Sequence, residues 1–159
     1  MMRKSVIYVL TAVLGVCSAI IVSCCFMMVL VTDVSMEPEI ANGSIVLVSK
    51  LDKELEVGDV VAFENDVYGE NGEGNILVRR VVAVSGDTVE IKDNMFYLND
   101  RPYTDHMSQA AHMKPYAKRT LTNGQVFVLC DDRQLSMDSR DDAVGILEID
   151  ECYGKVCFK

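Results

Sequence analysis

Basic residues, proline and histidine are all scarce in this sequence. Its 159 residues include 15 lysines and arginines against 24 aspartates and glutamates, which gives a formal net charge of −9. A chain this acidic is a poor candidate for nucleic-acid binding, which needs clustered cations against the phosphates. Proline occurs only three times and half of the residues are hydrophobic, so a disordered or collagen-like chain is excluded.

Charge is absent altogether from Val6 to Val31. This run would be about 39 Å long as a helix, and the hydrocarbon core of a bilayer is roughly 30 Å thick. A cleavable signal peptide would have a shorter apolar core of roughly 7–15 residues and a small-residue cleavage site. We find no convincing site of that kind before Asp33. The sequence therefore predicts a retained transmembrane helix over residues 6–32.

The charges that flank this run predict its orientation. Arg3 and Lys4 precede it, whereas Asp33 and Glu37 follow it and the next lysine is Lys50. Positive charges stay on the cytoplasmic side of a membrane. We expect a single-pass plasma-membrane protein with residues 1–5 in the cytoplasm and residues 33–159 as an extracytoplasmic domain.

The cysteines do not form a disulfide framework. Three of them belong to the apolar run and are expected to pack as small apolar residues: Cys17, Cys24 and Cys25. The other three follow it: Cys130, Cys152 and Cys157. This number is odd, and a Cys152–Cys157 bridge stays open. The spacing is not that of a zinc site, and His106 and His112 are the only histidines, so no metal site is expected.

The remainder of the chain has the pattern of strands. Short runs rich in valine and isoleucine lie at 45–51, 59–64, 76–84, 88–93, 95–100 and 125–130. Glycines and Asn-Gly punctuate them, as turns between strands do. We expect a hairpin that turns at Asp93-Asn94, and loops at 65–75 and 101–120. The fold class is therefore mostly β, a small barrel or folded sheet.

Three places concentrate residues that can carry chemistry. Ser35 lies on a predicted turn shortly before a strand, where a serine can be an exposed nucleophile. Arg79 and Arg80 are adjacent in an apolar strand, so they face opposite sides and one of them needs a buried partner. The stretch 130–145 (CDDRQLSMDSRDDAVG) is too polar for a strand, and reads as a solvated loop or as an ion-pair network that supports a site.

The order and spacing of these motifs along the chain resemble those of one protein family. Ser-Met-x-Pro follows a single N-terminal span, then come VGDVVAF, LVRRVVAVSGD and CDDRxxSxDSR. The combination is similar to the type I signal peptidases, in the short form typical of Gram-positive bacteria, and covers nearly the whole chain. The resemblance implies a transmembrane helix followed by a small β-barrel-like catalytic domain that needs no cofactor.

The resemblance also implies a mechanism in which a deprotonated lysine takes the proton from a serine. The nucleophile falls on Ser35, and the base falls on the position of Arg79. Arginine is effectively always protonated. To act as a base near neutrality it would need a pKa shift of about 5 units, or about 7 kcal/mol. An active enzyme would therefore need another base, and Lys50, Lys53 and Lys92 are the nearest lysines in sequence.

Other matches and departures follow from the same alignment of motifs. Asp33 stands where the family usually has Gly or Ser near the oxyanion hole, where a carboxylate would oppose the stabilisation of an oxyanion. Met36 resembles a residue that lines the substrate pocket. The remaining matches are expected to support the site: Arg80, for which we expect a structural ion pair, Asp131, Arg133, Ser136, Asp138, Ser139 and Arg140.

Two functions are consistent with this sequence. The first is a membrane-anchored serine endopeptidase that cleaves secreted preproteins after small residues and binds them by strand addition. The second is a catalytically impaired homologue that binds secreted or pilus subunits as an assembly factor. Ser35 favours the first, and Arg79 together with Asp33 favours the second. The expected partners are preproteins and the lipid bilayer, and not nucleic acid.

Overall fold

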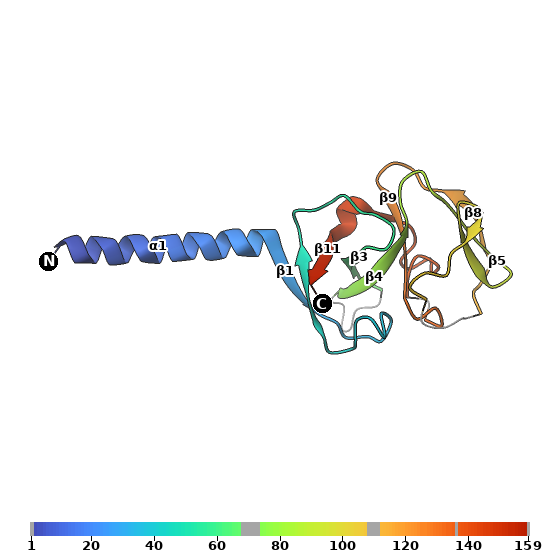
Figure 1. The fold of residues 1–159 in the computed structure, drawn as a ribbon, viewed down its shortest axis with the longest axis horizontal. Coiled ribbons are helices and arrows are strands. Elements are labelled where there is room, and N and C mark those ends of the chain that lie inside the picture. The colour runs from blue at the N-terminus through green and yellow to red at the C-terminus, as the bar shows by residue number, and fades with distance from the viewer. Residues whose placement is uncertain (1, 68–73, 108–111, 136, 159) are drawn as a thin grey trace.

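The computed structural model describes residues 2–67, 74–107, 112–135 and 137–158. Helix α1 (Met2–Cys25) projects away from a β domain that holds all the strands (Figure 1). Its segment Val6–Cys25 has a mean hydropathy of 2.5, and none of it is buried against the rest of the chain. By length and composition, α1 is able to cross a membrane.

The apolar run is divided between two elements, which corrects the expected helix over residues 6–32. α1 ends at Cys25, and the next five residues form strand β1 (Phe26–Leu30), which pairs antiparallel with β2 (Ile45–Ser49). In β1, Val29 is buried while both of its neighbours are exposed. This alternation is that of a strand with one face on the core, and the partner strand overrides the continuous hydropathy.

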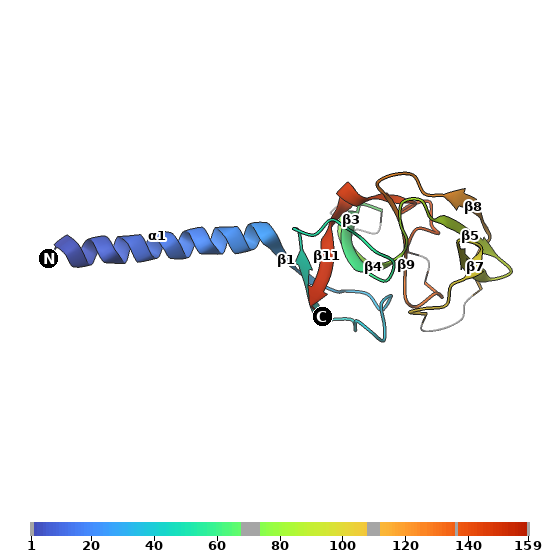
Figure 2. The same ribbon diagram turned by 45° about the horizontal axis from the view of Figure 1, so that its top comes forward.

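Seven strands form one antiparallel sheet in the order β1-β2-β11-β3-β4-β9-β10. Its further members are β3 (Val60–Asn65), β4 (Asn75–Ala83), β9 (Gln125–Leu129), β10 (Leu147–Glu148) and β11 (Cys152–Phe158), and the 3-10 helix η1 (Ile149–Glu151) precedes β11. The C-terminal strand β11 lies between β2 and β3, so the first and the last strand of the chain belong to one sheet, whereas the N-terminus lies at the far end of α1 (Figure 2).

A second antiparallel sheet lies at the end of the domain remote from α1 (Figure 1). It has the order β7-β6-β5-β8 and consists of β5 (Thr88–Lys92), β6 (Met95–Leu98), β7 (Arg101–Pro102) and β8 (Tyr116–Thr120). The predicted turn between β5 and β6 is confirmed. Asp93 and Asn94 both have positive φ, 52° and 61°, as a two-residue type I′ turn requires.

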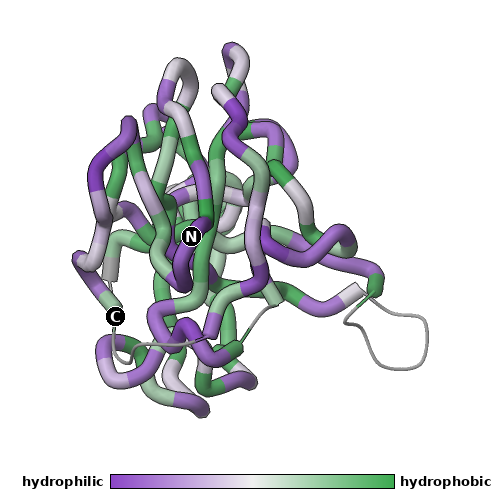
Figure 3. The backbone as a smooth tube through the Cα atoms, turned by 90° about the vertical axis from the view of Figure 1, so that its right-hand side faces the viewer, coloured by the Kyte–Doolittle hydropathy of each residue, from purple (hydrophilic) through white to green (hydrophobic). Residues whose placement is uncertain are grey.

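The strand pair β3–β4 lies at the centre of the larger sheet and contributes to apolar clusters on both faces. Val60 and Ala62 pack in one cluster, and Val61 and Phe63 pack in another, because successive strand residues face opposite sides. Hydrophilic segments lie mainly in the outer loops (Figure 3). The last seven residues of β4 are buried, so both arginines of this strand lie inside the protein.

The prediction of a mostly β domain is confirmed, and the described strands form two open sheets rather than a closed barrel. Five of the described strands were not predicted from the sequence, namely β1, β7, β8, β10 and β11, and β7 and β8 both correct the loop expected at 101–120. Two of the five show the physical reason. The first is β8, whose residues are largely exposed and polar. The second is β11, where a Cβ on Gly154 would lie 1.9 Å from the carbonyl oxygen of Ser49. Both strands depend on partners that are distant in sequence.

Candidate active site

The loop between β1 and β2 carries Ser35. Its base is closed where the Val31 N–H donates to the Ser44 carbonyl at 2.9 Å. Within the loop, the Ser35 N–H donates to Asp33 Oδ1 at 3.0 Å, a local turn that an aspartate two residues earlier favours. The Ser35 carbonyl accepts the N–H of Asp132 at 2.9 Å. Ser35 is fully buried, which corrects the expected exposed serine. The loop folds against β4 and the segment of Asp132, so the Ser35 backbone is held from both sides.

Strand β4 brings Arg79 to this serine. Arg79 Nη1 lies 2.6 Å from Ser35 Oγ and 3.0 Å from Asp33 Oδ2. On its other side, Arg79 Nε donates to the Met137 carbonyl at 2.7 Å. The two positions that the motifs single out, Ser35 and Arg79, are therefore in direct contact, although the chain separates them widely.

The direction of each hydrogen bond in this cluster follows from the chemistry of arginine. A guanidinium has only donors, so Ser35 Oγ accepts from Arg79. The hydroxyl hydrogen of Ser35 is then free to donate, and Asp33 Oδ1 lies 2.5 Å from Ser35 Oγ. A short O–H···O⁻ bond of this length is of the strong, charge-assisted type. In the resting state, the Ser35 hydroxyl therefore donates its hydrogen bond to Asp33.

Arg79 is not fully satisfied in this position. Nη1 also donates to the Val78 carbonyl at 2.6 Å, so its two hydrogens serve three acceptors. Nη2 is buried and has no hydrogen-bond partner among the described residues. Unsatisfied buried donors are uncommon in native proteins and call for an explanation beyond stability.

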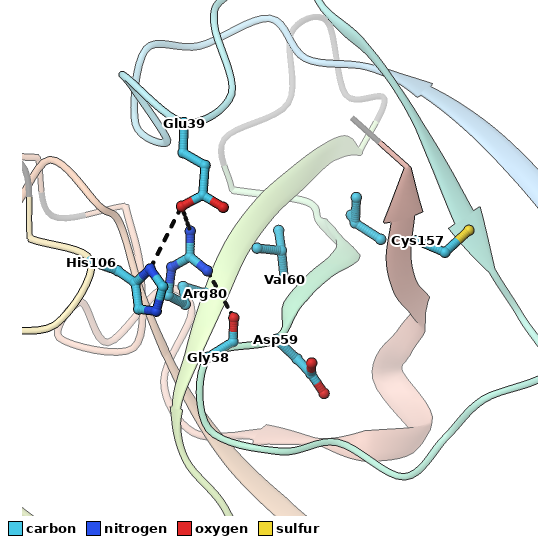
Figure 4. Close-up of a pocket in the computed structure, with 8 residues that line it drawn as sticks. Glu39, Gly58, Asp59, Val60, Arg80, His106 and Cys157 are labelled. Atoms are coloured by element: carbon cyan, nitrogen blue, oxygen red, sulfur yellow. Dashed lines mark hydrogen bonds and ion pairs between the residues drawn. The ribbon is translucent and has the colours of Figure 1, made fainter.

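Arg80, the next residue, faces a different set of partners and forms the predicted structural ion pair. Its Nε and Nη2 donate to the two carboxylate oxygens of Asp131 at 2.8 and 2.6 Å. Nη2 also donates to Glu39 at 2.6 Å, and Nη1 donates to the Gly58 carbonyl at 2.7 Å (Figure 4). The fork of Arg80 is paired at every nitrogen, which is the geometry that bidentate recognition requires.

A pocket of about 390 Å³ opens beside Arg80. His106 lies at its edge, with Nδ1 3.6 Å from the same Glu39 oxygen that Arg80 contacts (Figure 4). Sequence reasoning missed Glu39, because an isolated glutamate in a loop carries no signal of a partner on β4.

The described residues of the stretch 130–145 form the ion-pair and hydrogen-bond network that was one of its two predicted forms. Asp138 is buried and accepts the Cys130 N–H at 2.9 Å and Arg140 Nε at 2.8 Å. The hydroxyl of Ser139 accepts the Val128 N–H at 2.9 Å, which fastens the segment to β9. Arg140 Nη1 donates to the Arg133 carbonyl at 2.9 Å. This network holds the segment whose Met137 carbonyl contacts Arg79.

Two of the residues expected to support the site, Arg133 and Ser136, contribute no side-chain hydrogen bond to the described part of this network. Arg133 is buried, its Nη1 and Nη2 have no hydrogen-bond partner among the described residues, and burial lowers the pKa of its guanidinium. Ser136 lies outside the described residues. Met36 is fully buried in the apolar cluster of Ile40 and Val46, and its role at a substrate stays a prediction.

The cysteines of the β domain are free thiols. The Cys152–Cys157 disulfide, which the sequence left undecided, is therefore not formed. Burial raises the pKa of Cys130 to about 12 and that of Cys152 to about 11. Among the described residues, no group of three or more His, Cys, Asp or Glu side chains could hold a metal ion.

Comparisons with known proteins agree with the motifs. The family model described as "Signal peptidase, peptidase S26" matches residues 2–159. Signal peptidase IB of Staphylococcus aureus is 33% identical over 149 residues, covering 79% of this chain and 72% of that protein. Signal peptidase I of Bacillus caldolyticus is 28% identical over 139 residues, covering 79% and 74%. A crystal structure of a signal peptidase I from Enterococcus faecalis shares the fold, with a TM-score of 0.50 and 22% identity, over 65% of this chain and 97% of that one.

Proposed function

Because this chain belongs to the peptidase S26 family of signal peptidases, we propose that it is a membrane-anchored serine endopeptidase that removes signal peptides from secreted preproteins, with Ser35 as the nucleophile. The observation that carries the proposal is the position of Ser35 Oγ, 2.6 Å from Arg79 Nη1 and 2.5 Å from Asp33 Oδ1. A hydroxyl held between a cation and a carboxylate is oriented and polarised for attack.

The arrangement of β1 supports a preprotein as the substrate. β1 is an edge strand of the larger sheet, it follows directly on α1, and it leads into the loop of Ser35. An extended segment that emerges from the bilayer beside α1 would meet an unpaired strand edge before it reaches the serine. Strand addition at such an edge supplies main-chain hydrogen bonds without a demand on sequence, and small residues before the cut would be selected by the site itself.

We further propose that α1 spans the plasma membrane with residues 1–5 inside and residues 33–159 outside. Cys157 is an exposed thiol of the β domain, so it reports the side on which the domain lies. A membrane-impermeant maleimide applied to intact cells should label the parent chain, and the Cys157→Ser variant should lose that labelling. Labelling of Cys157 only after the cells are lysed would contradict the orientation.

The activity is tested by cleavage of a signal-peptide-bearing preprotein by the full chain in detergent. The parent should release the mature protein, and Ser35→Ala should abolish release without loss of fold. Ser49→Ala is a matched control. Among the described residues, the hydroxyl of Ser49 accepts one long hydrogen bond, from the Leu51 N–H at 3.4 Å. A parent chain that binds the preprotein and leaves it intact would overturn the proposal and favour an assembly role. The similar proteins are described as signal peptidases, which does not support that role.

A further inference from the structure

The cluster of Asp33, Ser35 and Arg79 answers a question that the proposed function leaves open, namely which group removes the serine proton. We propose that Asp33 is the general base of this enzyme and that Arg79 is a fixed cation that positions it. This inference rests on the proposed function, since it assumes that Ser35 attacks a peptide carbonyl.

Arg79 cannot take the proton itself. An arginine guanidinium has only donors and no lone pair available as an acceptor. The contact of Arg79 with Ser35 Oγ, at 2.6 Å, is that of a donor. A donor on Oγ stabilises negative charge that develops on this oxygen during proton removal, so Arg79 assists a base without being one.

The three lysines named from the sequence lie elsewhere. Lys50 follows the end of β2 that pairs with Phe26, opposite the loop of Ser35, and its N–H donates to the Cys25 carbonyl at 2.8 Å. Lys53 Nζ pairs with Asp150 at 3.4 Å, and Lys92 Nζ pairs with Glu90 at 2.8 Å. Among the described residues, the hydrogen-bond partners of the Ser35 hydroxyl are Asp33 and Arg79. Within the described part of the chain, Asp33 is therefore the acceptor within reach of the proton.

The geometry of Asp33 suits this role. Oδ1 receives the Ser35 hydroxyl at 2.5 Å, while Oδ2 is held by Arg79 at 3.0 Å. The side chain of Asp33 is 21% exposed, whereas Ser35 and Arg79 are fully buried. A carboxylate that is anchored through one oxygen and open to solvent is able to orient the serine first and a hydrolytic water later.

The reaction then proceeds in balanced steps. Ser35 Oγ attacks the scissile carbonyl carbon, its proton passes to Asp33 Oδ1, and the carbonyl π electrons move to the oxygen. When the tetrahedral intermediate collapses, the C–N bond breaks and the leaving amine takes the proton from Asp33. Water attacks the Ser35 ester and gives a proton to Asp33, which returns it to Ser35 Oγ as the acid is released. Arg79 keeps its protons in every step.

The test measures kcat and KM for preprotein cleavage by the full chain in detergent. Asp33→Asn should lower kcat by at least about 100-fold, because a general base contributes about 10²–10⁴-fold, and should leave KM within about threefold. Asp100→Asn is the matched control: this exposed carboxylate of the second sheet pairs with Lys118, and the variant should behave like the parent.

A double variant provides a rescue that a merely structural role of Asp33 would not predict. Asp33→Ser combined with Arg79→Lys restores the serine–lysine pair typical of the family and should recover activity lost in Asp33→Asn. Its pH profile should differ from that of the parent. A carboxyl group in general gives up its proton at a lower pH than an ammonium group does, so the acid limb of kcat/KM should move to higher pH in the double variant.

Three results would overturn the inference. Asp33→Asn could keep more than a third of the parental kcat, or have a kcat above that of the parent. Asp33 would then limit the reactivity of Ser35 and would not be its base. The parent could show an acid limb above about pH 7, a measurement that needs no variant and stays decisive if Asp33→Asn fails to fold. A folded parent that cleaves no preprotein would overturn the proposed function itself. If the parent and the Asp33→Asn variant both cleave, the proposed function stands and only the role of Asp33 as the base is overturned.

Discussion

Arg79 and Arg80 are neighbours on one strand, have the same side chain and are equally buried, yet their surroundings differ. Arg80 makes four hydrogen bonds with ideal fork geometry and faces Asp131, whose side chain is only 3% exposed. Arg79 shares one nitrogen among three acceptors, leaves Nη2 without a partner among the described residues, and faces the more exposed Asp33.

This difference separates an arginine that stabilises the fold, Arg80, from one that acts on a reacting group, Arg79. A buried charge that is paired at every nitrogen resists change, because the loss of one partner leaves the other uncompensated in a low dielectric. A buried charge with spare donors beside a hydroxyl is costly for stability and useful for polarising a reacting group. Strand alternation alone sends the two arginines to these two roles, and the predictions below test how far the roles are separate.

The largest effect on stability is expected at Arg80. Arg80→Met should lower the free energy of unfolding by about 3–5 kcal/mol, because it removes a bidentate cationic partner from the buried carboxylate of Asp131. Urea unfolding of the full chain in detergent, followed by tyrosine fluorescence, measures this loss. Arg80→Lys should lose less, since it keeps the charge without the fork. A loss below about 1 kcal/mol for Arg80→Met would show that Arg80 does not stabilise the fold.

A smaller loss is expected at Arg140, the other arginine with a buried carboxylate partner. Arg140→Met should cost about 2–3 kcal/mol, because Asp138 keeps its backbone donor at Cys130 after the guanidinium is removed. Arg133→Met serves as the matched control in the same segment, since its Nη1 and Nη2 have no partner among the described residues. Equal losses for the two variants, measured by the same unfolding experiment, would contradict this reading.

The thiol of Cys130 extends the comparison to high pH. Burial raises its pKa to about 12 in the folded protein, with Asp138 adding to the shift and Arg79 opposing it. The unfolded state therefore loses the thiol proton first, so stability is full below about pH 9 and falls as the pH rises, by up to about 1.4 kcal/mol per pH unit. Unfolding curves at pH 8, 9 and 10 should show this fall, and Cys130→Ala should reduce it. An unchanged slope in Cys130→Ala would assign the fall to other groups.

The smallest effect on stability is expected at Arg79. Arg79→Met should change the free energy of unfolding by less than about 1 kcal/mol, because it removes a poorly satisfied buried charge and leaves an Asp33 that solvent reaches. The same variant should be strongly impaired in preprotein cleavage. A stability loss as large as that of Arg80→Met would show that Arg79 stabilises the fold as well.

Much of the fold could be predicted from the sequence. The runs that became β2 to β6 and β9 have strand composition and turn signals of their own, and the Asp93-Asn94 turn depends on residues that tolerate positive φ. By contrast, β1 continues an apolar helix without any break in hydropathy, and β8 is mostly polar. These strands form because β2 and β5 offer them backbone hydrogen bonds, which a local pattern does not contain.

The sequence by itself determined the family, the division into an apolar helix and a β domain, and the positions of Ser35, Arg79 and Arg80, because motif order and strand periodicity are local properties. Only the tertiary structure decided what Asp33 does. From the sequence it was an unfavourable charge near an oxyanion. A local turn places its Oδ1 beside the Ser35 hydroxyl, and the close approach of β4 to the β1–β2 loop pairs its Oδ2 with Arg79. The ion pair with Arg79 joins segments that lie far apart along the chain, so no local pattern contains it.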